Sequence, residues 1–543
     1  MRARCTLAFL GLLLSTTVGA VTPIELAYDV VEFTVSPDGR YVAYSRYLDD
    51  VERIEVVSIG GGPPVHVFGV SGGPALNRGA FRFGPDSSRL IVRAQAVIPG
   101  DWTLYSVPIT GPPEHAVAIS SPDGASTGVS VWTISGDGAY VVYQSDEGEG
   151  GGDRLFSSPI TGPASARVRL DQLEGLQSSV AGLRLSDAGD EVYYAAFSGP
   201  GPSQVVRVPV TGPASAGQVL SDESKVGSGV VTHADEPFRQ AGDRLLFIGW
   251  DREALRYDLF SAELDAKHPR TSRLSPRALP ANRERILASP DGQWAVFTSP
   301  DEDDHPEDTL LSAPADGRSS AAEILAEQLD GGLYGDRLFV SPDSTRVLYQ
   351  LDAGFNERYD LFSVPIEGPA DATVQLSPVI PNDHRVLGVT FLPGGFVGFG
   401  IRTWTGPIVG YRAPVDGSSA AETLWDELPC YPSEPTRWFQ ARPDRDSALL
   451  TCFDYLPPGH GGFRVWLVRV AGARELPLLL ANTTDFAPGG RIDQEIEWTV
   501  DGDWLVFRVR DFVVPDRLFA LPIPRFWDGF ESGTLARWTE AAP

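Results

Sequence analysis

Five acidic loops hold the residues of this chain that are best suited to chemistry. Carboxylate oxygens are the ligands that Ca²⁺ prefers, so the densest loop, DEDDHPED at 301–308, is a candidate calcium site. Its weak ligand candidates are Asp301, Asp303, Asp304 and Asp308. No loop has the D-x-D-x-D-G spacing of a calcium-binding loop. Solvated surface is therefore the simpler interpretation, and no cofactor is expected unless calcium binds here.

Two cysteines offer a different chemistry. Cys430 and Cys452 are the cysteines that follow the N-terminal segment, and two cysteines in an oxidising compartment favour a disulfide. A zinc site would need partners of the CxxC or HxxxH kind, and the sequence has none. We therefore expect a Cys430–Cys452 disulfide.

One segment matches the pattern of a hydrolase nucleophile. Residues 69–73 read GVSGG, a G-x-S-x-G match, but that motif requires a strand before it and a helix after it. Here it lies in a Gly- and Pro-rich connection followed by PALNRG. We predict no catalytic residue from it.

The net charge and the N-terminal segment limit which partners and which compartment are expected for this protein. The formal net charge is −28, and so acidic a surface repels phosphate backbones, which argues against nucleic acid as a partner. Residues 1–20 read as a secretion signal, with basic MRAR, apolar CTLAFLGLLL and small residues before a cut near Ala20. No later stretch resembles a membrane span. The mature chain is expected to be periplasmic or secreted.

A repeated turn and strand position these loops. SPDGRYVAY at 36–44 returns as SPDGQWAVF at 289–297 and SPDSTRVLY at 341–349. Pro, Asp and Gly suit a type I turn, and the alternating apolar residues after it predict a strand. Successive copies start about 50 residues apart. Ten copies begin at Ser36, Gly84, Ser135, Ser186, Arg239, Ser289, Ser341, Leu392, Arg442 and Thr499.

Each unit also carries a second shared piece. It reads DWTLYSVPITGP at 101–112 and DLFSVPIEGP at 360–369, and it predicts a third strand that ends at proline, a turn, and a weaker fourth strand. A recurring Asp before this strand, as at Asp258 and Asp360, is expected to cap a local turn. Four antiparallel strands repeated in this way predict an all-β fold, a β-propeller of about ten blades.

Together the two pieces resemble the TolB-like, WD-repeat-like propeller repeat of exported bacterial proteins. The resemblance covers residues 23 to 525, and it implies a propeller without pointing to one activity. We divide the chain into a signal peptide at 1–20, a repeat region at 21–525 and a C-terminal tail at 526–543.

The ends of the repeat region suggest how the propeller closes. The last unit lacks a fourth strand, and VTPIEL at 21–26 aligns with fourth strands elsewhere. The N-terminal strand is therefore expected to complete the last blade and remove two open sheet edges. Such closure favours one large ring, although two smaller rings fit the even spacing nearly as well.

The acidic loops lie between the second and third strands of their units, so a propeller would place them on one face. We predict a non-enzymatic scaffold that binds another protein or macromolecule through this face, with a basic or calcium-bridged partner. The alternative is a hydrolase or lyase that acts on a carbohydrate or small molecule in the central channel. Candidate residues of the interaction face are Asp49, Asp50, Asp146, Glu147, Asp251, Asp301, Asp303, Asp304 and Asp352.

Overall fold

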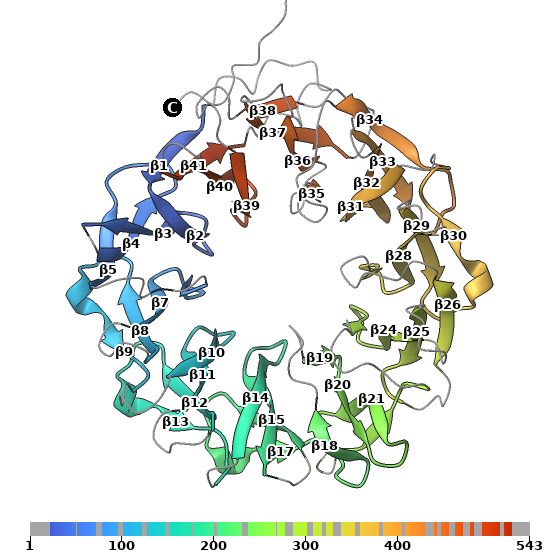
Figure 1. Cartoon of the computed structure of the whole chain (residues 1–543), viewed down its shortest axis with the longest axis horizontal. Coiled ribbons are helices and arrows are strands. Elements are labelled where there is room, and N and C mark those ends of the chain that lie inside the picture. The colour runs from blue at the N-terminus through green and yellow to red at the C-terminus, as the bar shows by residue number, and fades with distance from the viewer. Residues whose placement is uncertain are drawn as a thin grey trace, which may run out of the picture.

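The computed structural model shows one closed ring of ten β-sheets around a central channel (Figure 1). The ring form settles the choice between one ring and two. The structure describes residues 22–523, with gaps at 50, 72–75, 77–78, 96–100, 122–127, 147–151, 175–177, 200–202, 231–236, 266, 268, 277–285, 301–307, 318–321, 330–337, 353–358, 380–383, 404–407, 429–438, 442–446, 455–461, 471–477, 483–490 and 511–514.

Each sheet is one blade with its strands in chain order from the channel outward. Blade 1 consists of β2 (Val30–Val35), β3 (Tyr41–Leu48), β4 (Val51–Ser58) and β5 (Val65–Ser71), all antiparallel. The predicted four-stranded unit is therefore confirmed.

The next blades repeat this order. Blade 2 contains β6 (Phe81–Phe83), β7 (Arg89–Ala94), β8 (Thr103–Pro108) and β9 (Val117–Ala118). Blade 3 contains β10 (Val129–Ile134), β11 (Tyr140–Ser145), β12 (Arg154–Pro159) and β13 (Val168–Arg169). Blade 4 contains β14 (Ser178–Leu185), β15 (Glu191–Ser198), β16 (Gln204–Pro209) and β17 (Gln218–Val219). Blades 6 and 7 contain β23 (Leu287–Ala288), β24 (Trp294–Pro300), β25 (Asp308–Pro314), β26 (Glu323–Leu329); β27 (Leu338–Val340), β28 (Arg346–Asp352), β29 (Tyr359–Pro365) and β30 (Val374–Gln375). Blades 8 and 9 contain β31 (His384–Leu392), β32 (Phe396–Thr403), β33 (Ile408–Pro414), β34 (Glu422–Leu428); β35 (Phe439–Ala441), β36 (Ser447–Asp454), β37 (Gly462–Arg469) and β38 (Leu478–Asn482).

Blade 10 is built from both ends of the repeat region. Its first three strands are β39 (Arg491–Trp498), β40 (Trp504–Arg510) and β41 (Arg517–Pro522), and β1 (Ile24–Tyr28) pairs with β41 as the outermost strand. Arg508 Nη1 then donates to the carbonyl of Val30 in blade 1 at 3.4 Å. The predicted closure by the N-terminal strand is confirmed.

Blade 5 departs from the pattern because its innermost strand is split. β18 (Val226–Val230) pairs with the end of β20 (Arg244–Asp251), and β19 (Phe238–Ala241) pairs with its beginning. β21 (Arg256–Glu263) and β22 (Thr271–Arg273) complete a five-stranded sheet. Nothing in the repeat pattern predicted this interruption.

The core lies between blades rather than inside them. Strand side chains alternate between the two faces of a blade, so each buried layer takes residues from two neighbouring blades. Between blades 1 and 2, for example, Ile54 and Phe68 share one cluster with Phe81 and Val92, all at most 4% exposed.

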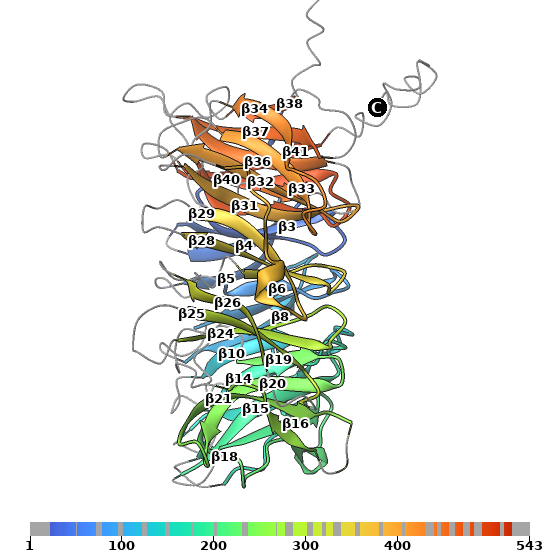
Figure 2. The same cartoon turned by 90° about the vertical axis from the view of Figure 1, so that its right-hand side faces the viewer.

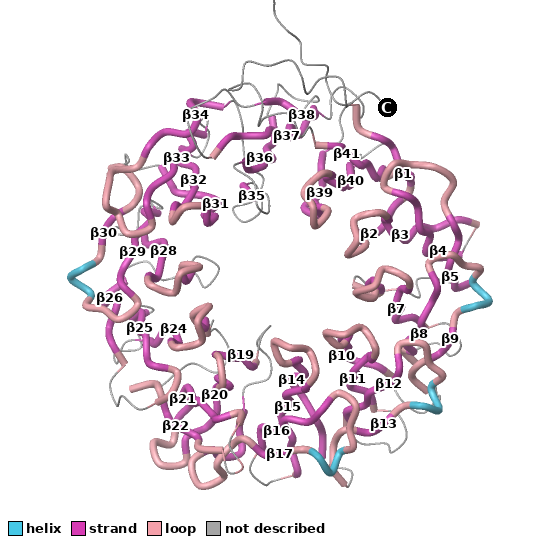
Figure 3. The backbone as a smooth tube through the Cα atoms, turned by 180° about the vertical axis from the view of Figure 1, so that it is seen from behind, coloured by secondary structure: helices cyan, strands magenta, loops and turns pink. Residues whose placement is uncertain are grey.

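The described helices are four short 3₁₀ turns at the outer wall, drawn in cyan in Figure 3. They span Pro113–His115, Ala164–Ala166, Ala214–Ala216 and Ala370–Ala372. Each follows the proline of a Gly-Pro pair after the third strand. No helix of the described residues is long and apolar enough to cross a membrane.

Candidate functional site

The ring has two faces that carry different connections. Figure 2 shows the ring from its side. Because the strands of a blade are antiparallel, the second-to-third-strand connections of all blades leave on one face, here called the loop face. The S-P-D-G turns between first and second strands lie on the opposite face, here called the turn face. The described residues of the acidic loops therefore lie on the loop face, as their position in the repeat predicts.

The described candidates for interaction take different positions on the loop face. Asp49 is exposed in the β3–β4 connection, with a φ of 52°. Asp146 is half-buried, and its carboxylate accepts a hydrogen bond from the Gly128 amide at 2.9 Å. Asp251 is buried at the end of β20.

The other predicted site residues fall outside what the structure describes. Asp308, Asp352 and Cys452 lie on β25, β28 and β36, but their side chains are not described. The calcium ligands and the disulfide stay predictions. Outside the described residues altogether are Asp50, Glu147, Asp301, Asp303, Asp304 and Cys430.

Asp251 holds the β20–β21 hairpin of blade 5 in one conformation. Its carboxylate accepts the amides of Glu253 and Ala254 at 2.8 and 2.7 Å, and its carbonyl accepts the amide of Leu255 at 2.9 Å. Arg273 lies 3.4 Å from the same carboxylate. Hydrogen bonds from a side chain to the following amides are a common way to fix a tight loop. This hairpin is therefore a pre-ordered projection from the loop face.

The hairpin carries apolar side chains at its tip. Leu255 is 69% exposed and has a φ of 54°. The half-buried rings of Trp250 and Tyr257 contact each other edge to face, with centroids 5.2 Å apart. We call Trp250, Leu255 and Tyr257 the blade 5 cluster.

Carboxylates on the turn face serve the turns themselves. In blade 3, Ser135 Oγ and the amide of Ala139 both donate to Asp137, and these hydrogen bonds hold the pKa of that carboxyl below its ordinary value. The same arrangement, with Ser341 and Thr345, lowers the pKa of Asp343. In blade 2 the hydroxyl and amide of Ser88 lower the pKa of Asp86 instead. The recurring Asp of the motif thus stabilises its own turn.

Neighbouring turns also bond to one another around the channel. The amide of Gly136 in blade 3 donates to the carbonyl of Gly189 in blade 4 at 3.0 Å. Equivalent bonds join other blades, from Asp38 N to Ser87 Oγ, from Asp187 N to Gln240 Oε1 and from Asp291 N to Ser344 Oγ. The motif is therefore a joint between blades as well as a turn.

A second set of joints uses a serine in the third strand. Ser261 Oγ donates to the carbonyl of Ala315 in the next blade at 2.5 Å. Ser312 repeats this toward Ile366 at 2.5 Å, and Ser363 repeats it toward Val415 at 2.6 Å. These serines are fully buried, and sequence reasoning assigned them no role. Their recurrence in the LFS and LLS segments was the available signal.

The prediction that Asp258 and Asp360 cap local turns is wrong. Both lie inside third strands, and each accepts a hydrogen bond from a serine beyond the fourth strand, Ser275 at 2.8 Å and Ser377 at 2.9 Å. Burial raises the pKa of Asp258 against the opposing effect of Ser275, Arg256 and Arg273. These carboxylates fasten the outer strand of their blade.

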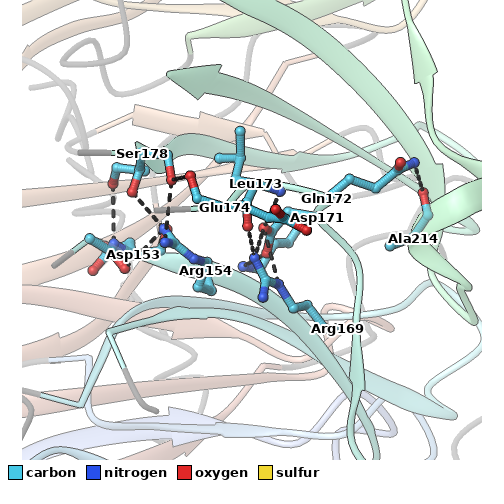
Figure 4. A network of polar contacts seen from close by, with 12 residues as sticks. Asp153, Arg154, Arg169, Asp171, Gln172, Leu173, Glu174, Ser178 and Ala214 are labelled. Atoms are coloured by element: carbon cyan, nitrogen blue, oxygen red, sulfur yellow. Dashed lines mark hydrogen bonds and ion pairs between the residues drawn. The ribbon is translucent and has the colours of Figure 1, made fainter. Parts of the chain in front are cut away.

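Blades 3 and 4 show a denser polar joint (Figure 4). The guanidinium of Arg154 on β12 donates to the carbonyl of Ser178 on β14 at 2.5 Å. Asp171 accepts the amide of Leu155 at 2.8 Å and pairs with Arg169 at 2.8 Å. These contacts join strands and neighbouring blades, so we assign this network a role in holding the blades together and not a catalytic role.

The serine of the G-x-S-x-G match lies on the outermost strand of blade 1. Ser71 of the G-x-S-x-G match ends β5, which pairs with β4, so the strand before it is present. Within the described part of the chain, no three His, Cys, Asp or Glu side chains are grouped closely enough to hold a metal ion.

Comparison with known proteins gives likeness of fold at a distance. No protein-family model matches the chain, and no curated protein matches it. The TolB-like resemblance therefore stays a prediction. Solved structures that match include a prolyl endopeptidase at 12% identity, covering 69% of this chain and 46% of that one, with a TM-score of 0.35.

Two further solved structures match at a similar distance. A eukaryotic initiation factor shares 13% identity over 74% of this chain and 90% of that one, with a TM-score of 0.41. Prolyl oligopeptidase B from Galerina marginata shares 15% identity over 69% of this chain and 56% of that one, with a TM-score of 0.35. The chain thus spans about half the length of the two peptidases.

Proposed function

We propose that this protein is an exported, non-enzymatic β-propeller that binds another protein or macromolecule through its loop face. The observation that carries the proposal is the placement of all second-to-third-strand connections on one face of a closed ring. Rigid blades hold loops of different sequence side by side, which suits a broad recognition surface.

The charge of the chain indicates the kind of partner. A net charge of −28 attracts basic surfaces and accelerates encounter with them. Carboxylates of the turn face, such as Asp137, are exposed but accept hydrogen bonds within their own turns. On the loop face, Asp49 is exposed and the acidic connections gather further carboxylates in sequence. A basic partner on the loop face therefore fits best.

The test is a crosslinking pull-down with residues 21–543 from envelope and secreted fractions, with and without Ca²⁺. A loop-face variant combines Asp49→Asn, Asp50→Asn and Asp146→Asn. Its matched control, with Asp38→Asn, Asp86→Asn and Asp137→Asn, removes the same charge from the turn face, and asparagine keeps an acceptor oxygen at each position.

We expect a specific partner that the loop-face variant loses and the turn-face variant retains. Salt screens exposed charges, so weaker binding of the partner at high salt would agree with a charged contact. No partner in either fraction, or equal loss with both variants, would overturn the proposal.

A further inference from the structure

We propose that the blade 5 cluster is the apolar anchor of the loop face, and that it binds a protein segment carrying apolar side chains and a net positive charge. This inference rests on the proposed function and names the contact that would dominate it. Binding energy in protein interfaces concentrates in a few residues, among which Trp, Tyr and Arg are enriched.

The backbone at the tip of this hairpin is unusual for its side chain. Leu255 has a φ of 54°, a conformation that suits Gly or Asn and is uncommon for a bulky residue. Its side chain is 69% exposed, so burial in this chain does little to offset that conformation. A single exposed leucine is ordinary, but one held in the left-handed region favours a role outside the fold.

The surroundings of Leu255 are rigid. Asp251 fixes the hairpin through three hydrogen bonds, and the amide of Arg252 donates to the carbonyl of Lys225 at 2.9 Å. A loop that is already ordered loses little conformational entropy when it binds.

The aromatic pair beside the tip is held by glycines of β18. A Cβ on Gly227 would lie 2.8 Å from Trp250 Cδ1, and one on Gly229 would lie 2.9 Å from Tyr257 Oη. Glycine therefore allows β18 to pack directly against both rings, which keeps them in place while they stay half-exposed.

Charge decides between kinds of occupant. Beside the cluster, exposed Arg252 is offset by exposed Glu253. The hairpin's other nearby cations are paired, Arg256 with Asp258 at 3.2 Å and Arg273 with Asp251 at 3.4 Å. The remaining field therefore comes from the strongly acidic molecule as a whole. A second copy with a charge of −28 would be repelled, whereas a basic segment would be attracted. The complementary occupant is thus a basic segment with an apolar side chain.

The test uses a phage-displayed library of random 16-residue peptides, selected on immobilised residues 21–543. Selected peptides are then synthesised and titrated against Leu255→Asn, Leu255→Met and Val500→Asn. Val500 is 71% exposed on the turn face and provides a matched control. Asparagine is close to leucine in size and tolerates the left-handed conformation.

We expect basic peptides with apolar residues whose binding weakens at least tenfold in Leu255→Asn and is kept in Leu255→Met and Val500→Asn. The melting temperature of Leu255→Asn should be equal to or above that of the parent. A lower melting temperature would show that Leu255 serves the fold, and the proposal would be wrong.

Three other results would also overturn the anchor: no selected peptide, peptides that ignore Leu255, or self-association that depends on Leu255. If the pull-down partner still binds Leu255→Asn, the anchor fails while the proposed function stands. If the pull-down finds no partner at all, the proposed function is wrong, and the anchor that rests on it falls with it.

Discussion

At the scale of single residues, glycine decides how closely two turns of neighbouring blades approach. Gly189 has a φ of 72°, and a Cβ there would lie 2.4 Å from the Cα of Gly136. The bond between these two turns requires that approach. Gly79 has a similar φ of 75°, but an added Cβ there would have nothing within 4 Å. A substitution at Gly79 therefore measures the cost of the left-handed conformation without the cost of crowding.

We predict that Gly189→Ala destabilises the protein more than Gly79→Ala. The left-handed conformation should cost alanine about 1 kcal/mol at either site. Crowding should add about 1–3 kcal/mol at position 189 alone. Urea unfolding of both variants measures the difference, and equal losses would contradict the joint between the turns.

Residue roles were only partly readable from sequence. Pro, Asp and Gly in SPDG identified the turn because their preferences are local. Asp258 was misread because its partner, Ser275, lies across the sheet, and local preference carries no information on such a contact. Asp251 was placed on the interaction face by its neighbours in sequence, yet its carboxylate is buried.

At the scale of elements, the third strand of a blade is tied to the blade that follows it. Ser312 on β25 is fully buried and donates to the carbonyl of Ile366, beyond the end of β29. Removing the hydroxyl leaves that carbonyl without this partner, and an unsatisfied buried acceptor is costly.

We predict that Ser312→Ala lowers the free energy of unfolding by about 1–3 kcal/mol. Ser224→Ala is the control. Ser224 is exposed in the loop before β18, and its hydroxyl donates to Asp222 at 2.7 Å. Water can replace that exposed bond, so the change should cost no more than about 0.5 kcal/mol. Urea denaturation compares the two. A loss at Ser312 no larger than at Ser224 would show that the inter-blade bond adds no stability.

Strand order could be predicted because each unit repeats the same turn and proline signals. The split first strand of blade 5 could not, since VGSGV and FRQA are short and carry no strong alternation. The blade that departs from the repeat also carries the proposed anchor, on its β20–β21 hairpin.

At the scale of the whole molecule, closure of the ring depends on the five residues of β1, which pair with strand β41 at the other end of the sequence. β1 supplies the outer strand of blade 10, and Glu25 pairs with Arg517 at 3.3 Å. Leu26 and Ala27 are buried in the layer shared with blade 1. Even spacing of repeats predicted ten blades but could not choose one ring, because the choice depends on contacts between blade 10 and blade 1.

We predict that deleting residues 22–28 opens this seam. Amides of β41 and β2 should exchange faster with deuterium, whereas those of β20 and β21 in blade 5 should change little. A synthetic peptide of residues 22–29 should restore the protection. Unchanged exchange in β41 would mean that β1 does not close the ring.

The central claim is that one face of this ring recognises a partner. The most direct measurement is electron microscopy of the crosslinked complex from the pull-down. A short tag inserted beside Val500, which is exposed in the β39–β40 turn, marks the turn face so that the two faces can be told apart. The account predicts partner density over the loop face, reaching the β20–β21 hairpin of blade 5. Density confined to the turn face or the outer wall would contradict it.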